Sequence, residues 1–226
     1  MELLDLKKRE VFFLGPRDSE WLFVQPVDEH DRAMPESEKE KISSLAPGLS
    51  FALAAFSADW DSELAPWDAE PVFRGQKPFS GGARTTLTYI EEELLPALSP
   101  CGARGVILGG YSLAGLFALW AGYESSRFRA VAAASPSVWF PGYTDYAAAR
   151  SFRAGAAALS LGDREDRTRH PLMCTVGSAL KKQYELLAAQ GIAADLTLHP
   201  GNHFVNADGR MAAAFVKATE LADRWK

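Results

Sequence analysis

One serine has a small residue two places before it and another two places after it, a context that suits nucleophilic chemistry. Ser112 stands in the sequence Gly-Tyr-Ser-Leu-Ala-Gly, directly after an apolar stretch at residues 105–109 and directly before an apolar helix predicted over residues 113–122. A sharp strand-to-helix turn exposes such a serine and needs small residues two places before and after it. Gly110 and Ala114 meet that need, although glycine is usual at the second place. The alternative interpretation is that Ser112 only caps the helix.

A nucleophilic serine needs a general base, and one of the four histidines is well placed for that role. His203 follows the last predicted strand, residues 196–199, and precedes the closing helix, predicted over residues 207–225. His199 ends that strand and is the competing candidate. A base that comes last along the chain fits the order nucleophile, acid, base, which is that of α/β-hydrolases.

A third group must orient the base, and three carboxylates follow the strand predicted over residues 157–161. In hydrolases of this chain order the acid commonly falls three residues after the glycine that ends the strand. Gly162 ends this strand, so Glu165 is the preferred acid, with Asp163 second and Asp166 third. The alternative is a solvated charged loop, because arginines alternate with these carboxylates.

Backbone N–H groups would hold the oxyanion that forms when the serine attacks a carbonyl group. The first is expected from Leu113, directly after the serine, and the second from the loop after the strand predicted over residues 21–24. Pro26 has no N–H, so Val27 or Asp28 is the expected second donor.

Short apolar runs alternate with amphipathic stretches, which indicates a mostly parallel sheet with helices on both faces. We expect a single α/β domain over residues 1–226, with five to six wholly apolar strands. Ligands bind beyond the carboxyl ends of such strands, and the three candidate groups all follow strands. Strands are predicted at residues 11–14, 21–24, 51–56, 105–109, 130–134, 157–161 and 196–199, and helices at 36–44, 85–95, 113–122, 173–190 and 207–225.

Composition favours a globular protein that acts on small molecules. Hydrophobic residues make up 47% and charged residues 23% of the 226 residues, and the net charge is −5 with no basic stripe. No apolar run is long enough to cross a bilayer, the first residues lack a signal-peptide pattern, and two distant cysteines suit a reducing compartment. We expect a cytoplasmic protein without nucleic-acid or membrane partners and without metal or cofactor; the oligomeric state stays open.

Four segments carry a resemblance to a known family. Residues 109–117, 135–139, 161–165 and 200–204 read Gly-Gly-Tyr-Ser-Leu-Ala-Gly-Leu-Phe, Ser-Pro-Ser-Val-Trp, Leu-Gly-Asp-Arg-Glu and Pro-Gly-Asn-His-Phe. In this order they resemble the esterase D group of α/β-hydrolases, which includes S-formylglutathione hydrolase, enterochelin esterases and mycolyltransferases. The resemblance is best to the small bacterial esterases of that group and covers roughly residues 20–220. It implies an α/β-hydrolase fold with Ser112 as nucleophile, Glu165 as acid and His203 as base.

Three features depart from the pattern of that group or limit it. The segment Gln-Pro-Val-Asp at residues 25–28 lacks the Leu-Asp-Gly usual at the oxyanion loop, and the region before Trp21 is short, so we expect the leading antiparallel strands of the family to be trimmed. Only residues 135–153 follow the strand at 130–134, which is room for one loop and one helix. No cap domain is therefore expected.

Aromatic side chains fall in loops at the expected ligand-binding edge, where they would suit an apolar acyl or alcohol group. Each could instead pack its loop onto the sheet. The pattern predicts a serine carboxylesterase that cleaves a small-molecule ester through an acyl-serine intermediate. An acyltransferase with the same triad and a non-catalytic hydrolase-fold binding protein are the alternatives. The candidate substrate-binding residues are Trp60, Trp67, Trp139, Phe140, Tyr143 and Phe204.

Overall fold

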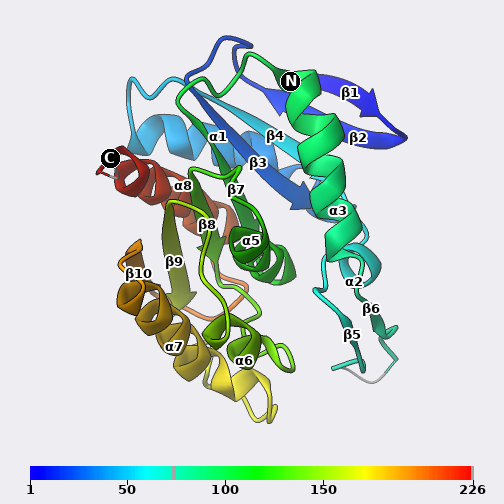
Figure 1. Cartoon of the computed structure of the whole chain (residues 1–226), viewed down its shortest axis with the longest axis vertical. Coiled ribbons are helices and arrows are strands. Elements are labelled where there is room, and N and C mark those ends of the chain that lie inside the picture. The colour runs from blue at the N-terminus through cyan, green and yellow to red at the C-terminus, as the bar shows by residue number, and fades with distance from the viewer. Residues whose placement is uncertain (73–74, 225–226) are drawn as a thin grey trace.

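A mostly parallel sheet organises the chain, as expected from its apolar strands. The computed structural model describes residues 1–72 and 75–224 (Figure 1). Within these ranges, one sheet has the strand order β1-β2-β4-β3-β7-β8-β9-β10, and β5 and β6 form a small separate sheet. The six strands β4, β3, β7, β8, β9 and β10 pair with their neighbours in parallel. At the other edge of the sheet, β2 pairs antiparallel with β4, and β1 pairs antiparallel with β2. The strands are β1 (Glu2–Leu6), β2 (Arg9–Leu14), β3 (Trp21–Val27), β4 (Phe51–Ser57), β5 (Asp68–Ala69), β6 (Phe79–Ser80), β7 (Gly105–Tyr111), β8 (Ala130–Ala134), β9 (Ala156–Gly162) and β10 (Ala193–His199).

Helices cover both faces of the sheet. Those on one face, α3, α5 and α7, share a core with the strands, while α1 and α8 pack together on the opposite face (Figure 1). The helices are α1 (Met34–Leu45), α2 (Trp60–Glu63), α3 (Ala83–Tyr89), the π-helix η1 (Ile90–Leu94), α4 (Leu95–Leu98), α5 (Leu113–Glu124), α6 (Tyr143–Ala148), the 3₁₀-helix η2 (Met173–Thr175), α7 (Val176–Ala189) and α8 (Ala207–Arg224). The predicted end of the last helix at Trp225 lies outside the described residues.

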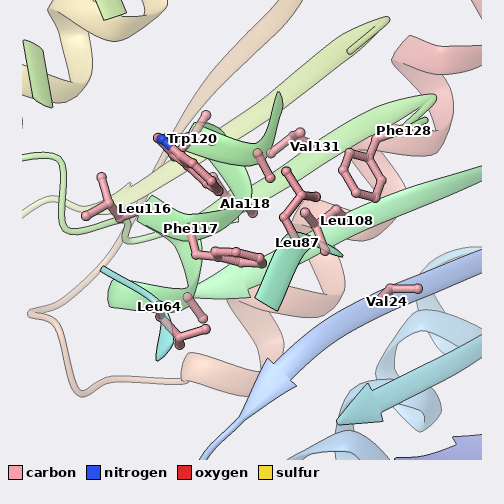
Figure 2. Packing of buried hydrophobic residues seen from close by; sticks show 14 of the residues in the cluster. Val24, Leu64, Leu87, Leu108, Leu116, Phe117, Ala118, Trp120, Phe128 and Val131 are labelled. Atoms are coloured by element: carbon pink, nitrogen blue, oxygen red, sulfur yellow. The ribbon is translucent and has the colours of Figure 1, made fainter. Parts of the chain in front are cut away.

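Helix α5 lies in the centre of the molecule because it is apolar on every side. Eleven of its twelve residues are buried. Figure 2 shows Phe117 and Trp120 of this helix packed beside Leu108 of β7 and Val131 of β8. A helix with no polar face has to lie between layers, and this one begins directly after Ser112. Its burial therefore fixes the position of the candidate nucleophile.

The expectation that the leading antiparallel strands are trimmed is wrong. Strands β1 and β2 form a hairpin whose two turn residues, Lys7 and Lys8, have φ angles of 56° and 68°. Two-residue hairpin turns of this type usually carry Asn-Gly or another pair that tolerates positive φ. A Lys-Lys pair gives no such signal, and residues 2–6 have little hydrophobic alternation, so the hairpin was not predicted from the pattern.

Other differences from the predicted elements are smaller. Strand β3 continues past Val24 through Pro26 to Val27, but its pairing with β7 stops at Val24, so the proline lies beyond the doubly paired part of the strand. Residues 57–80, where no helix or strand is predicted, contain α2, β5 and β6. Between β8 and β9 the chain forms α6 and no further element, as expected for a fold without a cap domain. None of the helices within residues 1–72 and 75–224 has the length and apolarity that a membrane span requires.

Candidate active site

Ser112 occupies a strained turn between β7 and α5. Its backbone angles are φ 57° and ψ −120°, a region that non-glycine residues rarely adopt and that costs about 1–3 kcal/mol. The turn needs the predicted small residue, because a Cβ atom at Gly110 would lie 2.3 Å from the carbonyl carbon of Ala114. The methyl group of Ala114 itself is accommodated. A nucleophile elbow requires a strained strand-to-helix turn of this kind, which exposes a serine hydroxyl at the carboxyl edge of a sheet.

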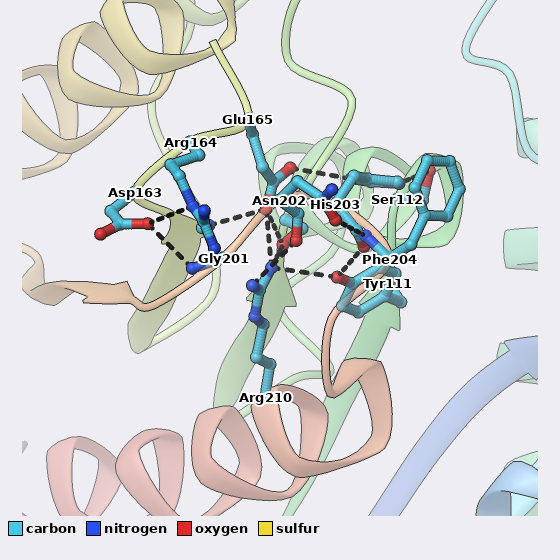
Figure 3. Close-up of polar contacts among 12 residues, drawn as sticks. Tyr111, Ser112, Asp163, Arg164, Glu165, Gly201, Asn202, His203, Phe204 and Arg210 are labelled. Carbon is cyan, nitrogen blue, oxygen red and sulfur yellow. Dashed lines mark hydrogen bonds and ion pairs between the residues drawn. The ribbon is translucent and has the colours of Figure 1, made fainter. Parts of the chain in front are cut away.

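The serine, histidine and glutamate singled out in the sequence meet at this edge (Figure 3). His203 Nε2 lies 3.1 Å from Ser112 Oγ, and His203 Nδ1 lies 2.8 Å from Glu165 Oε2. With the proton on Nδ1 donated to the carboxylate, Nε2 is free to accept the proton of the serine hydroxyl. The His203 side chain is 32% exposed and that of Glu165 only 3%, so a substrate can reach the histidine but not the acid.

Glu165 is held ionised by the groups around it. Its Oε1 accepts hydrogen bonds from Ser135 Oγ at 2.6 Å and from the backbone N–H of Gly162 at 2.7 Å. Burial raises the pKa of this carboxyl, but the hydrogen bonds from His203, Ser135 and Gly162 outweigh burial and bring the pKa below its ordinary value. An ionised carboxylate can orient the histidine and stabilise the imidazolium that forms during acyl transfer.

The two competing carboxylates have other partners. Asp163 Oδ1 accepts a hydrogen bond from the backbone N–H of Gly201 at 2.8 Å, which joins the loop after β9 to the loop after β10. Asp166 lies next to Gly177 at the start of α7. His199, the competing base, is in β10, and its carbonyl oxygen accepts a hydrogen bond from the Asp163 N–H. Neither aspartate nor His199 contacts the Ser112–His203 pair.

A cavity of about 380 Å³ opens beside Ser112 and His203. Two of the predicted aromatic residues, Trp139 and Phe204, line it. Phe204 is 88% exposed and stands edge-on to the His203 ring at a centroid distance of 5.4 Å. The volume falls within the range of small-molecule sites. The complete lining consists of Ser112, Ser135, Ser137, Trp139, Arg164, Glu165, Arg167, Thr168, Met173, Val176, Asn202, His203 and Phe204.

The remaining predicted aromatic residues do not line this cavity. Trp60 borders a separate polar groove near the ends of β3 and β4. The Trp67 Nε1–H donates to the carbonyl of Pro141, and its ring packs on Phe140, so it anchors a loop. Tyr143 is 1% exposed and donates its hydroxyl to Gln183 in the core. The prediction that Tyr143 contacts substrate is therefore corrected, since the apolar surroundings of α6 bury its ring completely.

The two expected oxyanion donors differ in their link to the nucleophile. Leu113 is the first residue of α5, where backbone N–H groups have no acceptor within the helix. Val27 ends β3, beside β7, and is 2% exposed. Ser137 is an additional polar neighbour, since its Oγ lies 3.4 Å from Ser112 Oγ and its N–H donates to the Ser112 carbonyl at 2.9 Å. In the described ranges no three His, Cys, Asp or Glu side chains gather into a possible metal site.

Sequence reasoning missed Arg210, which stands behind the acid. It is 1% exposed, and its Nη1 donates to Glu165 Oε1 at 2.8 Å. Helix α8 buries Met211, Ala214 and Ala218 on the same stripe. A charged residue on the apolar stripe of an amphipathic helix was the available signal, because buried charges require partners.

The fold and the site define the class of the protein, and a family model specifies it further. The mostly parallel sheet, its strand order and the helices on both faces are those of an α/β-hydrolase. The family model described as Putative esterase matches residues 55–226, and the chain belongs to this family. It is thus an esterase enzyme of the α/β-hydrolase type, which confirms the resemblance drawn from the four sequence segments. No curated protein matches the chain.

Solved structures share the fold at low sequence identity. An IroE-like serine hydrolase from Shewanella oneidensis is 16% identical, with a TM-score of 0.77 over 99% of this chain and 79% of the other. The siderophore hydrolase EstB from Aspergillus nidulans is 18% identical, with a TM-score of 0.74 over 96% and 93%. The enterobactin esterase FES from Shigella flexneri is 16% identical, with a TM-score of 0.63 over 97% of this chain and 58% of that chain. These likenesses show that the architecture is common to all four proteins.

Proposed function

We propose that this esterase is a serine carboxylesterase that hydrolyses small-molecule esters with a Ser112–His203–Glu165 triad. The observation that carries the proposal is the pair of contacts made by His203, at 3.1 Å to Ser112 Oγ and 2.8 Å to Glu165 Oε2. Nucleophile, base and acid come from three separate segments at one sheet edge. The contact from His203 to Ser112 has the length that proton transfer needs, and the contact from His203 to Glu165 has the length of a hydrogen bond that orients the imidazole.

In the first half-reaction Ser112 Oγ attacks the ester carbonyl carbon while His203 Nε2 takes the hydroxyl proton. The tetrahedral intermediate collapses, the carbon–oxygen bond to the alcohol breaks, and His203 returns the proton to the leaving alkoxide. In the second half, water attacks the acyl-serine while His203 takes its proton. The bond between the acyl carbon and Ser112 Oγ then breaks, His203 returns the proton to Oγ, and the carboxylic acid leaves. The Leu113 N–H and an N–H of Val27 or Asp28 hold the oxyanion in both halves.

The cavity supports a small ester as substrate. Its volume of about 380 Å³ suits one acyl or alcohol group of modest size, and Trp139 and Phe204 offer ring surfaces to that group. We include in the proposal that residues 1–226 form a single catalytic domain. We also propose a cytoplasmic location, which is supported by the free thiols of Cys101 and Cys174.

Turnover of model esters tests this function. The purified protein is expected to hydrolyse short-chain p-nitrophenyl esters, and Ser112→Ala is expected to lower kcat by about 10³-fold or more, since the nucleophile is removed. Lys217→Met serves as a control, because Lys217 lies on α8 and pairs with exposed Glu220. The proposal fails if the wild-type protein shows no hydrolysis above background, or if Ser112→Ala retains wild-type turnover.

A further inference from the structure

We propose that Arg210 is a positioning residue for the reaction, and that its guanidinium fixes the acid and the loop of the base relative to each other. Arg210 is in the first turn of α8, on the side of Glu165 away from the nucleophile (Figure 3). The proposal rests on the Ser112–His203–Glu165 function argued above and deepens it. It adds a fourth side chain, which acts through the triad and touches no substrate.

The Arg210 guanidinium is buried and makes hydrogen bonds in two directions. On one side Nη1 donates to Glu165 Oε1 at 2.8 Å and to Ser135 Oγ at 3.2 Å. On the other side Nη2 donates to the carbonyls of Pro200 at 3.2 Å and Asn202 at 2.9 Å. Both carbonyls belong to the three residues that directly precede His203. One planar group therefore connects the carboxylate to the backbone on which the histidine is mounted.

A second connection runs through the elbow itself. The Tyr111 hydroxyl donates to the carbonyl of His203 at 2.7 Å and accepts a hydrogen bond from Arg210 Nη1 at 3.3 Å. Tyr111 directly precedes the nucleophile. Arg210 is thus hydrogen-bonded to Glu165, to the loop that precedes His203 and to Tyr111 beside the nucleophile.

The end of β9 leaves room for this guanidinium. A Cβ atom at Gly162 would lie 2.9 Å from both Arg210 Nη atoms and 2.4 Å from the carbonyl oxygen of Gly201. The backbone and the arginine are therefore fitted to each other. Arginine suits the place because its rigid fork presents several N–H groups in one plane, whereas lysine has a single ammonium group on a flexible stem.

The charge of Arg210 has a consequence for the catalytic cycle. His203 alternates between neutral and protonated forms as it takes and returns the proton. A fixed cation on the far side of Glu165 keeps the carboxylate paired in both stages, so Glu165 does not have to turn when the imidazole is neutral. The expected result is a constant hydrogen bond from His203 Nδ1–H to Glu165.

Steady-state kinetics of Arg210→Met and Arg210→Lys test the proposal. Misplacement of a catalytic group by about 1 Å can cost about 100-fold in rate, so we expect Arg210→Met to lower kcat by about 10- to 100-fold with KM changed less than about threefold. Arg210→Lys should recover part of that loss. Because Arg210 acts through Glu165, Arg210→Met should add little to the loss of a Glu165→Gln variant. If the losses in kcat of the two single variants multiply fully in the double variant, the two side chains act independently, and the proposal is overturned.

A spectroscopic measurement separates positioning from folding and from turnover. The proton on His203 Nδ1 is expected to give a far-downfield ¹H NMR resonance in the wild-type protein, and this resonance should move or disappear in Arg210→Lys. The core variant Ile42→Val, which lowers stability away from the site, should keep it. If Arg210→Lys folds and keeps both the resonance and wild-type kcat, Arg210 is only structural. A wild-type protein that shows the resonance but hydrolyses no ester would count against the proposed function, and not against the position of Arg210.

Discussion

Glu165 differs from Asp163 and Asp166, the other two carboxylates of its loop, in the groups that surround it. It alone of the three carboxylates contacts His203, and its other oxygen receives hydrogen bonds from three donors. Asp163 binds the backbone of Gly201 instead. The roles of two carboxylates two residues apart are therefore set by which way each side chain points. This can be tested with matched amide substitutions.

We expect Glu165→Gln to lower kcat by about 10²- to 10⁴-fold, because an amide can neither fix the histidine tautomer nor stabilise the imidazolium. Asp163→Asn keeps an oxygen that accepts the Gly201 N–H, and its kcat should stay within about threefold of wild type. Steady-state kinetics on one p-nitrophenyl ester measure both. The reverse ranking would move the acid to Asp163.

At the scale of residues, Ser112, His203 and Glu165 could be singled out from the sequence because each follows a predicted strand, and the fold brings the three side chains together. Arg210 was not predicted, since its partners come from three different loops and the end of β7, and only the folded chain brings them together. Tyr143 was misassigned for a related reason. An aromatic residue in a loop can face either a cavity or the core, and local sequence does not distinguish the two.

At the scale of elements, helix α1 carries an unusual buried acid. Glu38 is fully buried, and its Oε2 accepts a hydrogen bond from Gln25 Nε2 of β3. The pKa of this carboxyl is raised to about 8. Burial is the largest cause of the rise, the hydrogen bond from Gln25 acts against it, and the nearby charge of Asp208 adds to it. The folded protein thus holds a proton on Glu38 that the unfolded chain, with a pKa near 4.5, has already lost at neutral pH.

This difference predicts that folding stability falls as pH rises. Between about pH 4.5 and 8 the native state binds more protons at Glu38 than the unfolded state does, so the free energy of unfolding decreases with pH and levels off above 8. The total effect is on the order of 4 kcal/mol. In Glu38→Gln this contribution is absent. The Tm of this variant relative to that of the wild type should therefore rise by about 8–16 °C between pH 5 and pH 9.

Thermal unfolding by circular dichroism at several pH values measures the effect. Glu36→Gln is the matched control, because Glu36 is exposed on the same helix and its substitution should leave the pH dependence unchanged. Parallel Tm curves for Glu38→Gln and wild type would contradict a protonated Glu38 in the folded state.

Prediction of elements was most accurate where one strong rule applied. Strand β8 and the buried helix α5 follow from runs of apolar residues. The β1–β2 hairpin was not predicted, because Lys7 and Lys8 adopt positive φ angles at a turn that usually carries glycine or asparagine. Helix 85–95 was expected to be regular, whereas η1 widens it to a π-helix over Ile90–Leu94, a detail of packing that side-chain periodicity does not encode.

At the scale of the whole molecule, charge is distributed unevenly around the candidate site. The chain carries a net charge of −5, yet the cavity beside Ser112 is lined by Arg164 and Arg167, and its one carboxylate, Glu165, is occupied by His203 and Arg210. A locally positive cavity in an acidic protein attracts negatively charged ligands more than the rest of the surface does.

We therefore expect Arg167→Glu to lower kcat/KM for an ester with a carboxylate in its acyl group by about 3- to 10-fold, and to leave a neutral ester of the same length unchanged. Arg169→Glu changes the charge of the molecule equally but lies outside the cavity lining, so it should have the smaller effect. The loss should shrink as ionic strength rises. Equal losses on charged and neutral esters would show that Arg167 does not select substrate by charge.

The central claim is that Ser112 is an activated nucleophile, and covalent labelling with a fluorophosphonate probe tests it most directly. Such a probe forms a bond only with a serine whose proton an adjacent base removes, so it reports on Ser112, His203 and the oxyanion donors together without requiring the natural substrate. We predict that the folded protein is labelled once, that peptide mass spectrometry places the adduct on Ser112, and that His203→Ala abolishes labelling. A folded protein that resists the probe, or an adduct on another serine, would contradict the account.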